Sequence, residues 1–264
     1  MSAVRIGVQF QTHGVRPPDF SDAAEQALSM GVDSIFLWDH LVPFTGTAAD
    51  SAWESWTLLG SMARAVRNTD VCLGILVSPL TFRRPAILAR AAATVAALGN
   101  GQFILGVGAG GFEPDDVLAE TEMSLAERMS RFTNGLQSVV DQVRDQERRH
   151  ELSLRVWVGG DGPRITIPAA AALADGWSGF GPPERFARGE DLLRSALMAD
   201  SGRKCERSVL LTPFDEPMDL AAFVNCGAEH VVRSLRPENG GTFDLQPIGD
   251  LLSQRNKLTS DDDA

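Results

Sequence analysis

The sequence has 264 residues, 44% of them hydrophobic and 22% charged, which suits one large α/β domain or two smaller ones. Its formal net charge of −11 argues against nucleic-acid binding, because that function depends on a basic surface. No apolar run approaches the ~18 residues of a membrane span, and Met1 to Val4 lacks the features of a secretory signal. We therefore expect a cytoplasmic protein that does not enter a membrane.

Strand and helix patterns alternate along the chain. Eight strands separated by helices predict an α/β fold, a single (β/α)8 TIM barrel, because this alternation closes a parallel sheet. An open doubly wound sheet is the alternative, since the last three strands have the weakest patterns. The expected strands are 5–10, 33–38, 71–77, 103–107, 155–158, 176–180, 208–211 and 229–232, and the expected helices are 19–30, 55–65, 85–98, 124–144 and 165–174.

No low-complexity linker divides the chain, so we expect one barrel domain over residues 1–255. Residues 256–264 include the acidic run Asp261 to Asp263 and are expected to form a disordered tail. The three cysteines, Cys72, Cys205 and Cys226, are odd in number and far apart. Their spacing predicts reduced thiols, with neither a disulfide framework nor a metal site.

Unusual residues follow several of the expected strands, at the barrel end where ligands bind. His13 follows the first strand, and Asp39 and His40 follow the second. Histidine titrates near neutrality and so suits proton transfer, with a structural role for His40 as the alternative. Phe44 and Trp53 lie in the loop after the second strand. We expect these two residues and His13 to line a substrate pocket.

Glycines end the fourth and fifth strands. They allow backbone amides to approach a phosphate closely, which predicts a phosphate-bearing cofactor; the alternative is that they only form tight turns. Arg83 and Arg84, after the third strand, either bind an anion or lie in a solvated loop. The glycine-rich turns comprise Gly108, Ala109, Gly110 and Gly111 after the fourth strand, and Gly159 and Gly160 after the fifth.

Several segments resemble, in order, the bacterial luciferase-like monooxygenase superfamily. The segments are DSIFLWDHLVPF, ESWTLLGSMARAV, LGILVSPLTFRRPAILARAAATVAALGNGQFILGVGAGGFEPDD and VWVGGDGPRITIPAAAALADGW, and the match runs from about Arg5 to Trp177. The resemblance implies a (β/α)8 barrel that binds flavin mononucleotide (FMN) or the deazaflavin coenzyme F-420 at its carboxyl-terminal face.

The Asp-His pair after the second strand resembles the deazaflavin-dependent branch of this superfamily. The resemblance implies that His40 handles the proton that accompanies hydride transfer, while Asp39 fixes the loop and contacts the cofactor edge. It also implies a non-proline cis peptide at Ile75–Leu76, with Val77 next, in a bulge that supports the middle ring of the cofactor.

Two departures from the family pattern affect the expected substrate. The deazaflavin-dependent sugar-phosphate dehydrogenases have a catalytic glutamate directly after the glycine turn, where this chain has Gly111 and places Glu113 two residues later. Their tryptophan after Asp-His is replaced by Phe44. We therefore expect a small organic substrate that is not a sugar phosphate, with Glu113 as the nearest candidate acid.

Three functional hypotheses follow. The first is an oxidoreductase that uses coenzyme F-420 for hydride transfer to or from a small organic substrate. The second is an FMN-dependent monooxygenase supplied with reduced flavin by a flavin reductase, and the third is a non-catalytic flavin-binding barrel. The resemblance also implies a homodimer.

Overall fold

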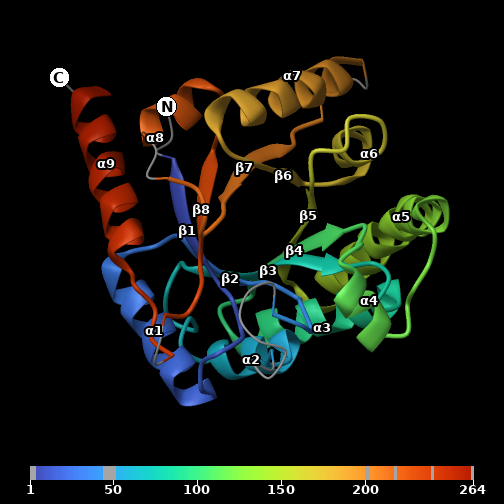
Figure 1. Cartoon of the computed structure of the whole chain (residues 1–264), viewed down its shortest axis with the longest axis horizontal. Helices are drawn as coiled ribbons and strands as arrows, with labels where there is room; N and C mark the ends of the chain where they lie inside the picture. The colour runs from blue at the N-terminus through green and yellow to red at the C-terminus, as the bar shows by residue number, and fades with distance from the viewer. Residues whose placement is uncertain (1–3, 44–51, 200–202, 217–218, 239–240, 263–264) are drawn as a thin grey trace.

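The computed structural model describes residues 4–43, 52–199, 203–216, 219–238 and 241–262 (Figure 1). Its strands form a closed barrel in chain order, in which every strand pairs in parallel with the next and the eighth pairs with the first. The TIM barrel is therefore confirmed, and the alternative of an open sheet is wrong. The strands are β1 (Arg5–Phe10), β2 (Ser34–Leu37), β3 (Cys72–Pro79), β4 (Gln102–Gly108), β5 (Ser153–Gly159), β6 (Gly176–Phe180), β7 (Glu206–Leu211) and β8 (His230–Leu235).

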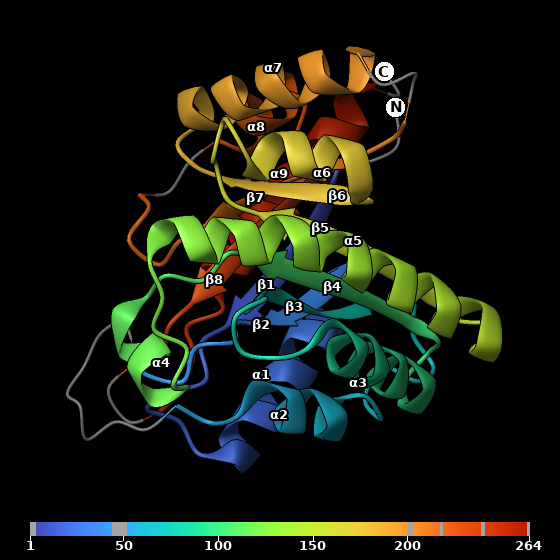
Figure 2. The ribbon, with the colours of Figure 1, turned by 90° about the vertical axis from the view of Figure 1, so that its right-hand side faces the viewer.

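Helices surround the barrel on its outer side, where their apolar faces cover the sheet (Figures 1 and 2). The longest of those described, α5, begins at a capping box formed by Ser124 and Glu127, and it continues past its expected end at Arg144. The helices are α1 (Pro17–Met30), α2 (Ser55–Met62), α3 (Pro85–Leu98), α4 (Glu113–Leu118), α5 (Leu125–His150), α6 (Thr166–Leu173), α7 (Pro183–Ala199), α8 (Leu220–Asn225) and α9 (Gln246–Asp262).

The carboxyl-terminal segment differs from its expected state. Residues 256–262, expected to begin a disordered tail, are the last turns of α9, which runs through Asp262. Ile248, Leu251 and Leu252 of this helix are buried at helical spacing and anchor it to the barrel. Residues 256–262 therefore continue a helix that packs on the barrel through its earlier turns.

The barrel interior has an apolar middle layer and a polar layer at its amino-terminal end. Phe36, Ile104, Trp157 and Val232 belong to the apolar layer. In the polar layer, the Glu206 carboxylate lies among two arginines and a histidine, so the amino-terminal end of the barrel is closed by ion pairs. The partners of Glu206 are Arg5, Arg155 and His230.

None of the helices within the described ranges is long and apolar enough to cross a membrane.

Candidate active site at the carboxyl end of the barrel

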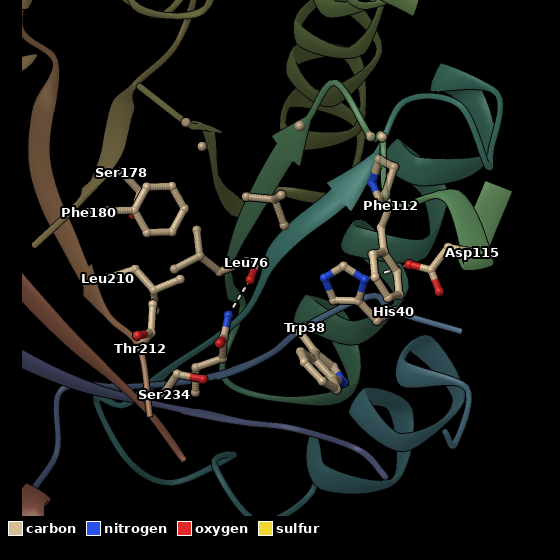
Figure 3. Close-up of a pocket in the computed structure, with 18 of the residues that line it drawn as sticks. Trp38, His40, Leu76, Phe112, Asp115, Ser178, Phe180, Leu210, Thr212 and Ser234 are labelled. Atoms are coloured by element: carbon tan, nitrogen blue, oxygen red, sulfur yellow. Dashed lines mark hydrogen bonds and ion pairs between the residues drawn. The ribbon is translucent and has the colours of Figure 1, made fainter. Parts of the chain in front are cut away.

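A cavity of about 540 Å³ opens at the carboxyl-terminal ends of the strands, within the usual size range of small-molecule sites. Figure 3 shows two facing walls with Leu76 between them. His40 and Asp115 belong to one wall, where Trp38 and Phe112 also lie. The opposite wall contains Ser178, Phe180, Leu210, Thr212 and Ser234.

His40 is fixed by a carboxylate that comes from a distant part of the chain. Its Nδ1 lies 2.5 Å from Oδ2 of Asp115, a residue that is 75 positions away in the sequence. The other oxygen of Asp115 accepts hydrogen bonds of 2.8 Å from the backbone amides of Leu41 and Val42. The second ring nitrogen of His40 lies away from Asp115, on the side of Leu76 (Figure 3). One edge of the imidazole is thus held while the other is turned toward the cavity.

Two aromatic rings restrict His40 from its sides. The Trp38 ring packs against it edge to face at 4.8 Å between centroids, and the Phe112 ring does so at 5.6 Å. These contacts fix the plane of the imidazole, because rotation about its side-chain bonds would drive it into one of the rings.

Asp39 has a different environment from the one expected of a residue that contacts a cofactor. Its buried carboxylate accepts hydrogen bonds from Ser78, at 2.5 Å, and from the Arg83 guanidinium and the Trp56 indole. Arg83 also binds Glu54 at 2.8 Å, so this arginine joins the segments that follow β2 and β3. Asp39 is not among the described residues that line the cavity. The Asp39–Arg83 pair therefore fixes the loops that carry His40.

A bulge in β3 forms the floor of the cavity. The pairing of β3 with β4 shifts register between Ile75 and Ser78, and the peptide bond between Leu76 and Val77 is cis. The cis bond had been expected one position earlier, at Ile75–Leu76, so that expectation is corrected to the next bond. Leu76 and Val77 line the cavity, whereas Ile75 is fully buried in the core.

The strand-end glycines have two separate roles. A Cβ at Gly108 would lie 2.7 Å from a Val77 methyl carbon, and one at Gly159 would lie 2.6 Å from the other. These two glycines therefore make room for the bulge in β3. Gly110, Gly111 and Gly160 have φ angles of 74°, 114° and 118°, which other residues rarely adopt.

The glycine turn after β4 also lies next to a cation. The guanidinium of Arg128, from α5, occupies the place where a Cβ at Gly111 would point, with its central carbon 2.6 Å from that position. Arg128 has no ion-pair partner among the residues that the structure describes, and its Nε is buried without a hydrogen bond. A guanidinium beside these glycines suits an anionic group such as a phosphate.

Besides Asp39 and Ile75, three further expected site residues lie outside the described lining of the cavity. His13 is buried and stacks on Trp38 at 5.3 Å, and Trp53 donates a hydrogen bond from its indole to the Val15 carbonyl at 2.6 Å. Glu113 is exposed in the first turn of α4. Phe44 lies outside the described residues. The structure thus brings together His40, Leu76, Val77, Gly108, Ala109, Gly110, Gly111, Gly159 and Gly160 around the cavity.

Sequence reasoning missed Asp115, Trp38 and Phe112. The run Glu113-Pro114-Asp115-Asp116 carried a signal for Asp115, because proline and acidic residues are favoured in the first turn of a helix. That signal predicts α4 and not its contact with His40. Among the residues described, no group of histidine, cysteine and carboxylate side chains could hold a metal ion.

Comparison with known proteins places this cavity in a family context. The chain is 30% identical over 242 residues to phthiodiolone/phenolphthiodiolone dimycocerosates ketoreductase from Mycobacterium tuberculosis, a match that spans 77% of this chain and 62% of the ketoreductase. It is 31% identical over 162 residues to F420-dependent glucose-6-phosphate dehydrogenase from Kribbella flavida, across 61% of this chain and 45% of that enzyme. The chain thus spans less than two thirds of the length of these relatives.

A solved structure shares the whole fold. An F420-dependent secondary alcohol dehydrogenase, in complex with an F420–acetone adduct, superimposes with a TM-score of 0.76 at 15% identity and covers 96% of this chain and 99% of its own. The family profile for luciferase-like monooxygenases matches residues 2–214. The chain therefore belongs to the luciferase-like monooxygenase family.

Proposed function

We propose that this protein is an oxidoreductase that uses coenzyme F-420 to transfer a hydride to an uncharged carbonyl compound, or from the corresponding alcohol. The observation that carries the proposal is the position of His40, held by Asp115 beside the bulge of β3 with its second nitrogen on the cavity side. That is where a proton must be given or taken during reduction of a carbonyl group.

Several residues fit the coenzyme. The bulge at Leu76 and Val77 offers an apolar surface for the flat ring, and Gly110 and Gly111 with the Arg128 guanidinium offer an anion site for its phosphate. The related glucose-6-phosphate dehydrogenase is F420-dependent by name, which favours this coenzyme over FMN.

Different residues have different roles in the proposed reaction. The reduced coenzyme, when bound, supplies a hydride to the carbonyl carbon. His40 gives a proton to the carbonyl oxygen through the ring nitrogen that faces the cavity, and it takes that proton back in the reverse direction. Trp38 and Phe112 exclude water from the sides of the imidazole.

The charge of the cavity favours a neutral substrate. No lysine or arginine belongs to the part of its lining that the structure describes, and its charged side chains there, His40 apart, are Asp115 and Asp116. A phosphate or carboxylate on the substrate would meet negative charge. This agrees with the expectation that sugar phosphates are not substrates, and the ketoreductase relative favours a ketone.

The FMN-dependent monooxygenase is the second candidate, because the family as a whole is described by that activity. It would require a flavin reductase as a partner. The non-catalytic barrel is disfavoured, since the glycine turns line the cavity and His40 is held in place.

Two further expectations stay predictions, namely a location in the cytoplasm and a homodimer. The side chains of Ile87 and Leu98 on α3 are 55% and 46% exposed, which offers apolar surface for a second copy. Sedimentation analysis would measure the mass in solution directly.

Anaerobic turnover tests the proposed reaction. The protein is mixed with reduced F-420 and a neutral ketone, and the oxidised coenzyme and the alcohol are both quantified. We expect equal amounts of the two products without oxygen. A reaction that requires oxygen and reduced FMN, and yields an oxygenated product, would establish the monooxygenase instead.

A further inference from the structure

We propose that Asp115 is the positioning residue of the reaction: it holds the proton of neutral His40 on Nδ1, so that Nε2 is the atom that exchanges a proton with the substrate. This inference rests on the proposed function. It assigns a role to a carboxylate of α4 that neither the sequence pattern nor the family resemblance connects with His40.

The geometry around Asp115 leaves little freedom for its carboxylate. One oxygen accepts hydrogen bonds of 2.8 Å from the backbone amides of Leu41 and Val42, and the other lies 2.5 Å from His40 Nδ1. An ionised carboxylate has no proton to donate, so the proton of this contact comes from the imidazole. Asp115 is 1% exposed, which excludes water as a competing partner.

The same contact ties two loops together. Leu41 and Val42 follow β2, whereas Asp115 lies in the first turn of α4, after β4. The carboxylate therefore sets both the direction of the imidazole and the path of the loop that carries it. Trp38 and Phe112 fix the plane of the ring, so Asp115 supplies the remaining constraint, namely which nitrogen is protonated.

Asp115 also compensates for a carboxylate that the glycine turn does not offer. At Gly111 the φ angle of 114° disfavours any side chain, and the Arg128 guanidinium fills the adjacent space. The Asp115 carboxylate, four residues further along the chain, contacts the histidine on the side away from the cavity. The cavity then needs only one proton-transferring group, which suits a carbonyl–alcohol conversion.

The proton balance is complete with these groups. In reduction, protonated His40 gives its Nε2 proton to the carbonyl oxygen while the carbonyl carbon receives the hydride, and the product is the alcohol. His40 is left neutral with its proton on Nδ1 against Asp115, and it regains the Nε2 proton from solvent. Asp115 takes no proton in this cycle and keeps its contact with Nδ1 throughout.

The first test reads the tautomer in the protein without coenzyme. The sequence contains 4 histidines, so nitrogen-15 labelling of histidine gives few signals, and His40→Ala assigns the relevant pair. We expect neutral His40 to carry its proton on Nδ1. A proton found on Nε2 in the wild-type protein would overturn the proposal without any variant.

The second test uses Asp115→Asn with a matched control. The asparagine oxygen can still accept the hydrogen bonds from the two backbone amides. Its NH₂ group then faces Nδ1 and donates to it, so the His40 proton must lie on Nε2. We expect a reversed tautomer and a loss of kcat of about 100-fold or more, in line with other wrong-tautomer variants, at unchanged coenzyme affinity. The control, Glu120→Gln, removes a negative charge from an exposed residue directly after the same helix and should leave kcat within about 2-fold.

The outcomes separate this inference from the proposed function. A retained Nδ1 tautomer with near wild-type kcat in Asp115→Asn would overturn the role of Asp115, and so would equal losses in both variants. Failure of the wild-type protein to use F-420 would contradict the proposed function instead, and the tautomer would still report on Asp115.

Discussion

The barrel contains a histidine–carboxylate pair at each end, and the two pairs differ in their exposure and in the groups that surround them. His40 and Asp115 lie at the carboxyl end, where the His40 side chain is 25% exposed on the cavity side. His230 and Glu206 lie at the amino end, where the His230 side chain is 1% exposed. The first pair borders a cavity, whereas the second is enclosed by its own partners.

The partners of the enclosed pair explain its role. The Ser34 hydroxyl lies 2.8 Å from His230 Nε2, so both ring nitrogens are engaged within the protein. Burial lowers the pKa of His230, which keeps the ring neutral. Burial alone would raise the pKa of Glu206, but its hydrogen bond with His230 and the charges of Arg5 and Arg155 hold that pKa below its usual range. His230 is therefore buried within its own network, whereas His40 borders the cavity.

The largest effect should come from removing the exposed histidine. His40→Ala should lower turnover by about 100- to 10,000-fold, because the proton-transferring group is lost. Its melting temperature should stay close to that of the wild type, since the residue borders a cavity. Steady-state kinetics and thermal unfolding measure the two properties, and wild-type turnover would remove His40 from the mechanism.

At the enclosed end we expect a variant to lose stability while its turnover is unchanged. Glu206→Gln leaves the Arg5 and Arg155 guanidiniums without their counter-charge and should reduce the free energy of unfolding by about 2 kcal/mol. This is less than the ~3–5 kcal/mol found for fully buried pairs, because both arginines are partly exposed. Urea unfolding measures this loss, with turnover per folded molecule unchanged.

Glu229→Gln is the matched control, because the exposed Glu229 pairs with Arg207 on the outside of the barrel. It should change the free energy of unfolding by less than about 0.5 kcal/mol. Equal stability losses in the two variants would show that the enclosed network has no special role.

Substitution of a glycine that packs against the β3 bulge should have an effect of intermediate size on stability. Gly108→Ala should reduce the free energy of unfolding by about 1–3 kcal/mol and weaken coenzyme binding, because its Cβ would overlap Val77. The loss should be smaller when Gly108→Ala is made in a Val77→Ala background.

Gly60→Ala is the control for this glycine effect. It places the same methyl group inside α2, where no atom lies within 4 Å, and should stabilise the protein by about 0.5–1 kcal/mol. A loss in Gly108→Ala that Val77→Ala does not relieve would argue against the packing explanation.

The smallest effect is a pH dependence of stability at the enclosed end. The folded protein keeps His230 neutral below the ordinary histidine pKa of about 6.5, whereas the unfolded chain binds a proton there. The stability that this group contributes is therefore complete above about pH 6.5 and is lost as the pH falls, by at most about 1.4 kcal/mol per pH unit. Urea unfolding between about pH 7.5 and 5.5 measures the slope.

The variant His230→Gln isolates this contribution from that of the other titrating groups. It should show a shallower slope over the same pH range. An identical slope in the two proteins would mean that His230 is already protonated in the folded state.

Sequence patterns predicted the barrel well, because strands such as β3 and β4 are largely apolar and alternate with helix patterns along the chain. They missed α4 and α8, which are six residues long each, and also α7 and α9, and the acidic end of α9 obscured the buried Ile248 and Leu251. At the site, His40 was predicted from its place after β2. Its partner was not, because the contact joins residues 75 positions apart and depends on how the barrel closes.

We propose that the carboxyl end of this barrel binds a deazaflavin, and direct titration is the best test of this proposal. The purified protein is titrated separately with F-420 and with FMN, and the quenching of each coenzyme's fluorescence is followed. We predict saturable binding of F-420 with clearly weaker binding of FMN, and a loss of F-420 affinity in Gly160→Val. Preferential binding of FMN would contradict the claim and favour the monooxygenase.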